Sequence, residues 1–157
     1  MRQKTEAAQA AKIIRNELKK HGVHGHVKSS NYSMGSSVKV KLIDPMPATL
    51  EKVKSFCFKF QYGHFDGMTD SYEHSNNRED IPQAKYVLVP AEYSTHLQLE
   101  VWDWLKANFS GFEAAPDSVF DAHNFYHEGM RESGARILYK YIHSDEFWKT
   151  KKPRIAA

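Results

Sequence analysis

The sequence predicts an α+β fold. A small, mainly antiparallel sheet, made of one hairpin and one further strand, is expected to pack on helices, with a helical lobe at the C-terminus. Apolar residues recur at helical spacing near both ends of the chain, and between them they alternate with polar residues. The length of 157 residues allows a small domain with an appended lobe. We expect an α-β-β-α-β domain over residues 1–92 and a helical extension packed on it over residues 93–157.

The first predicted helix covers residues 5–20. Thr5 is the expected N-cap, because threonine hydroxyls accept hydrogen bonds from free amides at helix starts. Gly22 is placed to end the helix, because glycine readily adopts the left-handed conformation found there. The apolar face follows spacings of three and four residues through Ala7, Ala11, Ile14 and Leu18.

The predicted hairpin consists of residues 26–30 and 36–43, joined by a turn-rich segment. In its second strand, apolar residues alternate with lysines in the order Val38, Lys39, Val40, Lys41 and Leu42. Because successive side chains of a strand point to opposite faces, one face is predicted to be buried and the other to carry the lysines. Lys28 of the first strand is expected to join this basic face.

The remaining elements follow the same two patterns. We predict a helix over residues 49–60 with Cys57 facing the core, a polar loop over residues 61–83 and a strand over residues 85–89. In the C-terminal part, helices are predicted over residues 94–109, 118–127 and 136–148.

Trp102 and Trp104 flank Asp103 in the third long helix, so their side chains cannot both face one core. Two interpretations remain open. The helix is either held between two apolar surfaces, or one tryptophan is exposed and anchors a partner. Trp102 is the predicted anchor.

Three segments resemble one protein family. They are residues 11–20 (AKIIRNELKK), 35–40 (GSSVKV) and 65–71 (FDGMTDS). Over residues 8–92 the chain is similar to one of the large polyvalent protein-associated domains, which phages and conjugative plasmids carry in proteins assigned to early steps in a new host. One difference is the sequence DPMP, which stands where the family more usually has an Asp-Gly-Pro turn. The resemblance implies a phage or plasmid origin and a task directed at a host system, and it assigns no catalytic residue.

Composition excludes several classes of protein. Hydrophobic residues make up 41% of the chain and aromatic residues 13%, which excludes wholesale disorder. No uncharged run approaches the roughly 18 residues that span a bilayer, so no membrane partner is expected. A single cysteine and an N-terminus without an apolar signal core predict a location in the reducing cytoplasm of the host cell.

Charge is segregated along the chain, although the net charge is only +3. Residues 1–60 carry twelve Lys and Arg against four Asp and Glu, residues 61–130 carry three against twelve, and residues 131–157 carry seven against three. Segments of opposite charge either neutralise each other within one fold or meet different partners.

The acidic middle segment predicts a protein partner, because a dense set of carboxylates imitates a phosphate backbone and fits a basic groove. Phe65 or Met68 is expected to pin the loop to the core, while Asp66 and Asp70 stay polar. The predicted partner-binding residues are Phe65, Asp66, Asp70, Glu73 and Trp102.

The lysines of the hairpin predict a second kind of partner. Exposed lysines bind phosphate groups, and a tyrosine at the hairpin turn is able to stack on a base. The predicted nucleic-acid-binding residues are Lys28, Tyr32, Lys39 and Lys41. The alternative is that the lysines only keep one sheet face hydrated.

Imidazoles and carboxylates in the polar loop give a third interpretation, because both are ligands of zinc and other divalent ions. The candidate ligands are His64, Asp66, Asp70 and His74. Their spacing does not match a compact zinc site, and the chain has no nucleophile or phosphate-loop motif. We expect no metal and no cofactor, and a hydrated loop in which Asp66 caps local amides is the alternative.

Together with the resemblance, these features predict a non-enzymatic interaction protein from a mobile element. We expect it to inhibit or modulate a host defence complex, as an anti-CRISPR protein does, by stoichiometric binding. Its partner is then a host defence protein or ribonucleoprotein complex. One alternative is a nucleic-acid-binding accessory protein that acts as DNA enters the host, and another is a metal-dependent enzyme.

Overall fold

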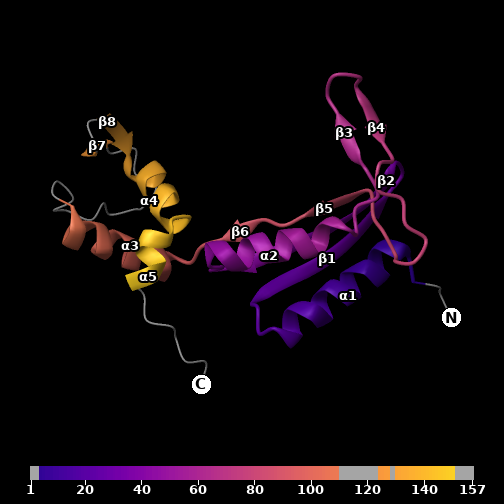
Figure 1. The fold of residues 1–157 in the computed structure, drawn as a ribbon, viewed down its shortest axis with the longest axis horizontal. Coiled ribbons are helices and arrows are strands. Elements are labelled where there is room, and N and C mark those ends of the chain that lie inside the picture. The colour runs from indigo at the N-terminus through magenta and orange to yellow at the C-terminus, as the bar shows by residue number, and fades with distance from the viewer. Residues whose placement is uncertain (1–3, 110–123, 128–129, 151–157) are drawn as a thin grey trace. The chain divides into compact units, whose positions relative to one another are not determined.

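A computed structural model describes residues 4–109, 124–127 and 130–150, and Figure 1 shows its helices and strands. The chain divides into two compact units, Met1–Glu92 and Tyr93–Ala157. The N-terminal unit contains the main sheet and two helices, and the C-terminal unit contains further helices and a small hairpin. The predicted α+β class is therefore confirmed. None of the helices in the described ranges is long and apolar enough to cross a membrane.

Helix α1 spans Glu6–Lys20 and confirms the first predicted helix. The Thr5 hydroxyl accepts a hydrogen bond from the Ala8 amide at 3.3 Å. After the helix, Gly22 has a φ of +66°, the left-handed conformation that favours glycine. Both ends of α1 therefore have the residues that the sequence predicts for them.

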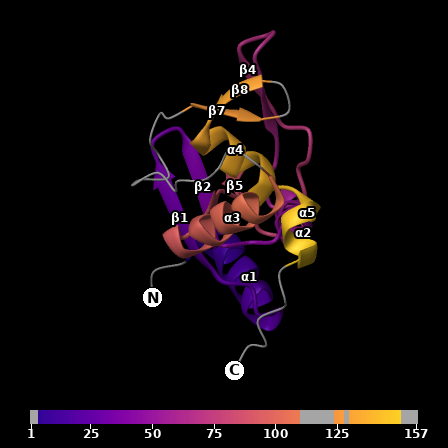
Figure 2. The same cartoon turned by 90° about the vertical axis from the view of Figure 1, so that its left-hand side faces the viewer.

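The strands β1 (Gly25–Tyr32) and β2 (Gly35–Ile43) form the predicted antiparallel hairpin. On the other side of β2, the strands β5 (Tyr86–Leu88) and β6 (Ala91–Glu92) pair with it in parallel orientation. Figure 2 shows β1, β2 and β5 side by side. Pro90 separates the two short strands because it has no amide hydrogen to donate, yet its carbonyl oxygen accepts a hydrogen bond from β2 at 2.9 Å.

Helices α1 and α2 (Pro47–Phe58) pack on the same face of this hairpin. The shared core includes Ile14, Leu18, Val38, Val40, Leu42, Leu50 and Val53. Cys57 of α2 is 1% exposed, as predicted, and burial raises the pKa of its thiol to about 11. Among the described residues 4–92, α1 and α2 are the only helices, so no helix from this range lies on the opposite face of the hairpin.

The expected polar loop over residues 61–83 contains a short hairpin, which corrects the prediction. Strand β3 (His64–Asp66) pairs antiparallel with β4 (Ser71–Glu73). Strands of three residues are too short for an alternating pattern to be visible in the sequence. Gln83, which follows this hairpin, is buried. Its side-chain amide nitrogen donates hydrogen bonds to the backbone carbonyl oxygens of Lys59 and Asn76 at 2.8 Å each, and these bonds hold the two ends of the segment together.

The C-terminal unit confirms the predicted helical lobe with α3 (Thr95–Asn108), α4 (Gly134–Ile142) and α5 (Asp145–Thr150). It also contains an antiparallel hairpin of β7 (Asn124–His127) and β8 (Met130–Ser133). The helix predicted over residues 118–127 is therefore wrong for residues 124–127. Residues 118–123 lie outside the described part of the chain.

Trp102 is buried, which contradicts its predicted role as an exposed partner anchor. It is 1% exposed and belongs to the core of the C-terminal unit. The ring of Trp104 also packs inside this unit, with centroids 5.3 Å from Tyr141 of α4 and 6.0 Å from Phe147 of α5. Both tryptophan side chains pack within the unit because apolar side chains of α4 and of α5 contact α3.

Candidate functional site

The face of the β1–β2 hairpin that points away from the core carries the predicted basic residues. The register pairs Lys28 with Lys39 and His26 with Lys41. Directly paired residues of antiparallel strands share a face, so the predicted shared basic face is confirmed. We call it the lysine face and define it by His26, Lys28, Ser30, Tyr32, Ser37, Lys39 and Lys41. Binding of nucleic acid by these residues stays a prediction.

The charge at the centre of the lysine face is not balanced. Lys28 and Lys39 are exposed, and like charges placed directly opposite each other destabilise a strand pair. In the described ranges neither forms an ion pair with an acidic side chain. Lys41 differs, because its ammonium nitrogen lies 3.0 Å from a carboxylate oxygen of Glu92 in β6. An anion bound between Lys28 and Lys39 would relieve the repulsion.

One end of the lysine face is aromatic. The sequence predicts Tyr32 at this end, but not the aromatic residues of other segments that lie beside it. Tyr32 pairs with Gly35 in the register and is 48% exposed. Tyr86 lies on the same face because it pairs with Ser37 of β2. Ring centroids 5.3–5.7 Å apart connect Tyr86 to further aromatic residues, which together form a cluster of Tyr62, Tyr72, His74 and Tyr86.

Lys85 links Tyr32 to this cluster. Its ammonium nitrogen lies 5.0 Å from the centroid of the Tyr72 ring and donates to the Met34 carbonyl oxygen at 3.2 Å. A Cβ atom on Gly35 would lie 2.7 Å from Cδ of Lys85 and 3.4 Å from Cε2 of Tyr32. Because Gly35 of the GSS segment has no side chain, the side chains of Lys85 and Tyr32 both have room beside the start of β2.

Tyr72 ties the β3–β4 hairpin to the sheet. Its hydroxyl donates a hydrogen bond to the Lys85 carbonyl oxygen just before β5. Burial raises the pKa of Tyr72 to about 12, so the phenol keeps its proton and remains a donor at neutral pH. Beside it, the rings of Tyr62 and His74 are stacked with planes 1° apart. The base of the hairpin is therefore held by aromatic packing and a backbone hydrogen bond.

Gly63 lies where the chain passes closest to β4. A Cβ atom here would overlap the Glu73 carbonyl oxygen and lie 2.6 Å from Cε1 of Tyr72. We expect Gly63→Ala to lower the free energy of unfolding by about 1–3 kcal/mol, because backbone must shift to accommodate the methyl group. Gly67→Ala is the matched control, since no atom lies within 4 Å of its added Cβ. Urea denaturation followed by circular dichroism measures both, and equal stability of the two variants would contradict the close approach.

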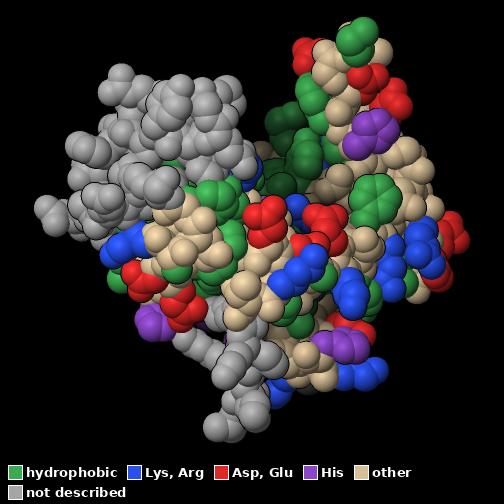
Figure 3. All heavy atoms as spheres, turned by 60° about the vertical axis from the view of Figure 1, so that its left-hand side comes forward, with side chains coloured by type: hydrophobic (Ala, Val, Ile, Leu, Met, Phe, Trp, Pro, Cys, Tyr) green, Lys and Arg blue, Asp and Glu red, His purple; other side chains and the backbone are tan. Residues whose placement is uncertain are grey.

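Except for Trp102, the predicted partner-binding residues all lie on the β3–β4 hairpin. We call residues 65–70 the hairpin tip. Phe65 is 54% exposed and Met68 is 95% exposed, so the expectation that one of them pins the loop to the core is wrong. The hairpin is held at its base by Tyr72, and its tip extends away from the sheet. Figure 3 shows hydrophobic and acidic side chains together on this projection.

Asp66 shapes the hairpin tip. Its carboxylate accepts a hydrogen bond from the Met68 amide at 2.9 Å, and this bond lowers the pKa of the carboxyl below its ordinary value. The predicted amide-capping role of Asp66 is therefore confirmed. Asp70 has a φ of +51°, a left-handed conformation that aspartate tolerates, and it is exposed together with Glu73. The tip thus presents two large apolar side chains among carboxylates.

The four candidate metal ligands do not form a site. His64 hydrogen-bonds the Ser75 hydroxyl at 2.9 Å, while the ring of His74 is stacked on Tyr62. Within the described ranges, no group of three or more His, Cys, Asp or Glu side chains has an arrangement that could hold a metal ion. We assign no metal chemistry to His64, Asp66, Asp70 and His74.

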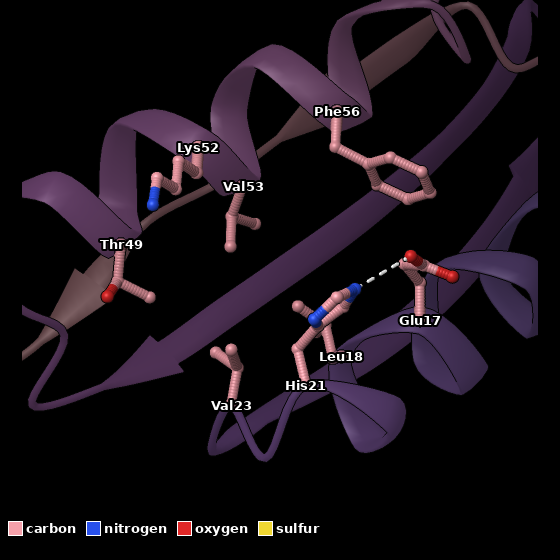
Figure 4. Close-up of a pocket in the computed structure, with 8 residues that line it drawn as sticks. All are labelled: Glu17, Leu18, His21, Val23, Thr49, Lys52, Val53 and Phe56. Carbon is pink, nitrogen blue, oxygen red and sulfur yellow. Dashed lines mark hydrogen bonds and ion pairs between the residues drawn. The ribbon is translucent and has the colours of Figure 1, made fainter.

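A cavity of about 320 Å³ lies between α1 and α2, and its lining is shown in Figure 4. Leu18 of α1 and Val53 and Phe56 of α2 provide apolar walls. At its rim, Nε2 of His21 lies 3.0 Å from Glu17, and both side chains are at least 36% exposed. The cavity therefore offers no desolvated acid or base, and none of the predicted site residues lines it.

Comparison with known proteins gives one match. The family model described as large polyvalent protein associated domain 29 matches residues 5–99, more than half of the chain. This match includes the lysine face, the hairpin tip and the aromatic cluster, and it agrees with the resemblance seen over residues 8–92. No curated protein and no solved structure matches the chain. The chain therefore belongs to the family of large polyvalent protein associated domain 29, and with it to the proteins associated with phages and other mobile elements.

Proposed function

We propose that this protein is a non-enzymatic binding protein that holds nucleic acid on its lysine face. The observation that carries the proposal is the direct pairing of Lys28 with Lys39 on an exposed face, with no acidic partner in the described ranges. Such a pair costs stability in the free protein, and phosphate oxygens supply the missing negative charge. A mobile-element protein with this property would act as an accessory factor on DNA that enters a host.

The salt dependence of binding tests this proposal. A protein that neutralises phosphates releases bound counterions, so the logarithm of its association constant falls linearly with the logarithm of the salt concentration. Contacts from Lys28, Lys39 and Lys41 predict a slope of about −2 to −3. Fluorescence anisotropy with a labelled oligonucleotide at several salt concentrations measures this slope. Binding that does not change with salt would contradict phosphate contacts.

The hairpin tip supports a second candidate, stoichiometric inhibition of a host defence complex such as a CRISPR effector. The supporting observation is the exposure of Met68 and Phe65 beside Asp66 and Asp70. Large apolar side chains provide most of the binding energy at protein interfaces, and surrounding carboxylates steer the tip toward a basic groove.

Titration of a purified CRISPR effector complex tests the second candidate. We expect inhibition to saturate near one protein per complex, to weaken with salt and to persist with EDTA, because binding needs no turnover and no metal. Met68→Asp should abolish inhibition, whereas Met34→Asp, at another exposed methionine, should not. Inhibition at a substoichiometric dose would indicate an enzyme instead.

A further inference from the structure

We infer that the lysine face takes single-stranded rather than duplex nucleic acid, with an unpaired base stacked on Tyr32; this inference rests on the proposed function. The lysines alone do not distinguish the two forms, because both present phosphates. The distinction comes from what lies beside the lysines on the same face.

Tyr32 and Lys28 lie on one face of one strand. They are four residues apart on β1, an even number, so their side chains point to the same side. At the rise of an extended strand, about 3.3 Å per residue, their Cα atoms are about 13 Å apart. A strand of nucleic acid that meets the lysines therefore needs only a short run of backbone to bring a base to Tyr32.

Neighbouring groups restrain the Tyr32 ring in the free protein. Opposite it stands Gly35, which has no side chain, and the ring passes close to the point where a Cβ would be. The Tyr32 hydroxyl lies 3.4 Å from the Ser36 carbonyl oxygen. Lys85 supports the same corner through its bond to Met34. Nearly half of the Tyr32 surface nevertheless stays exposed, so a stacking surface is present in the free protein.

An exposed ring on a sheet face favours unpaired bases. Every base has a flat face that stacks on an aromatic ring, but in a duplex these faces are already covered by neighbouring base pairs. A protein reaches the bases of a duplex only with an element that enters a groove, such as a helix or a strand ribbon. The lysine face of β1 and β2 is packed on α1 and α2 from behind, and it offers Tyr32 and the lysines together.

The test compares two labelled probes, an oligothymidylate of about twelve nucleotides and a duplex of equal length. We expect the wild-type protein to bind the single strand at least about tenfold more tightly, and Tyr32→Ala to remove most of this preference. Tyr32→Phe should keep it, because the ring is retained. Tyr139→Ala is the matched control, since Tyr139 is 67% exposed on another element. Circular dichroism confirms that each variant is folded.

The possible failures are distinct. Equal or tighter binding of the duplex, with an intact salt dependence, overturns the inference and leaves the proposed function standing. Preferential binding of the single strand that is unchanged in Tyr32→Ala overturns the stacking role. Absence of binding to either probe at low salt overturns both the inference and the proposed function.

Discussion

Replacing Lys28, Lys39 and Lys41 together with glutamate is expected to weaken the binding of nucleic acid by about 100-fold or more at low salt. The three ammonium groups lie on one face, and reversing their charge turns attraction for phosphate into repulsion. Each lost phosphate contact should also reduce the salt slope by about 1. Anisotropy titrations of the wild type and the variant measure both quantities.

A matched control separates local charge from net charge. Lys12 and Lys20 of α1 and Lys52 of α2 are exposed lysines on helices, away from the lysine face. Reversing these three changes the net charge by the same amount. If this control variant loses as much affinity as the first, binding follows overall charge and the lysine face has no special role.

The single substitution Lys28→Glu should act in opposite directions on stability and on binding. It places a carboxylate directly opposite Lys39 and replaces repulsion by attraction, which should raise the free energy of unfolding by about 0.2–1 kcal/mol. The same change removes a phosphate contact, so affinity should fall. Loss of stability and affinity together would show that Lys28 has a structural role.

Trp102→Ala is expected to lower the free energy of unfolding of the C-terminal unit by about 3–5 kcal/mol, because it leaves a large cavity in a closely packed core. The side chain is 1% exposed and lies among residues of three helices. Leu99→Ala is the matched control on the same helix, since Leu99 is 44% exposed, and its effect should stay within about 0.5 kcal/mol. Denaturation followed by far-ultraviolet circular dichroism measures both. A Trp102→Ala variant that unfolds like the wild type would contradict the burial of this side chain in the core.

Helices α1, α2 and α3 and the β1–β2 hairpin could be predicted because their signals are local. Thr5 and Gly22 bound α1 through chemistry that operates within one turn, and the alternation of Val38 and Lys39 describes both faces of β2. Strand β3 could not be found in this way, because three residues give no measurable period. The burial of Trp102 depends on α4 and α5, which are distant in sequence from α3.

The candidate site was predictable to a similar degree. Lys28, Lys39 and Lys41 were placed on one face from alternation alone, and the register agrees. The aromatic cluster was missed because Tyr62, Tyr72 and Tyr86 come from separate segments, and no pattern in any one of them indicates that they meet. One signal is present at the end of β4, where Tyr72 and the following His74 stand two residues apart, the spacing that places side chains on one side of an extended chain.

The strands that pair with β2 are synthesised at very different times: β1 directly precedes β2, whereas β5 and β6 follow it after a long segment. Its pairing with β1 closes a tight turn. By contrast, the Ser36 hydroxyl of β2 accepts a hydrogen bond from the amide of Lys85, which directly precedes β5 and follows Ser36 by 49 residues. At synthesis rates of about 5–20 residues per second, one edge of β2 stays open for about 2–10 s. An open edge beside buried valines is a template for pairing with another nascent chain, and lysines on such a strand oppose that pairing. Lys39 and Lys41 therefore stand at positions where lysine disfavours pairing of β2 with a second chain while this edge is open.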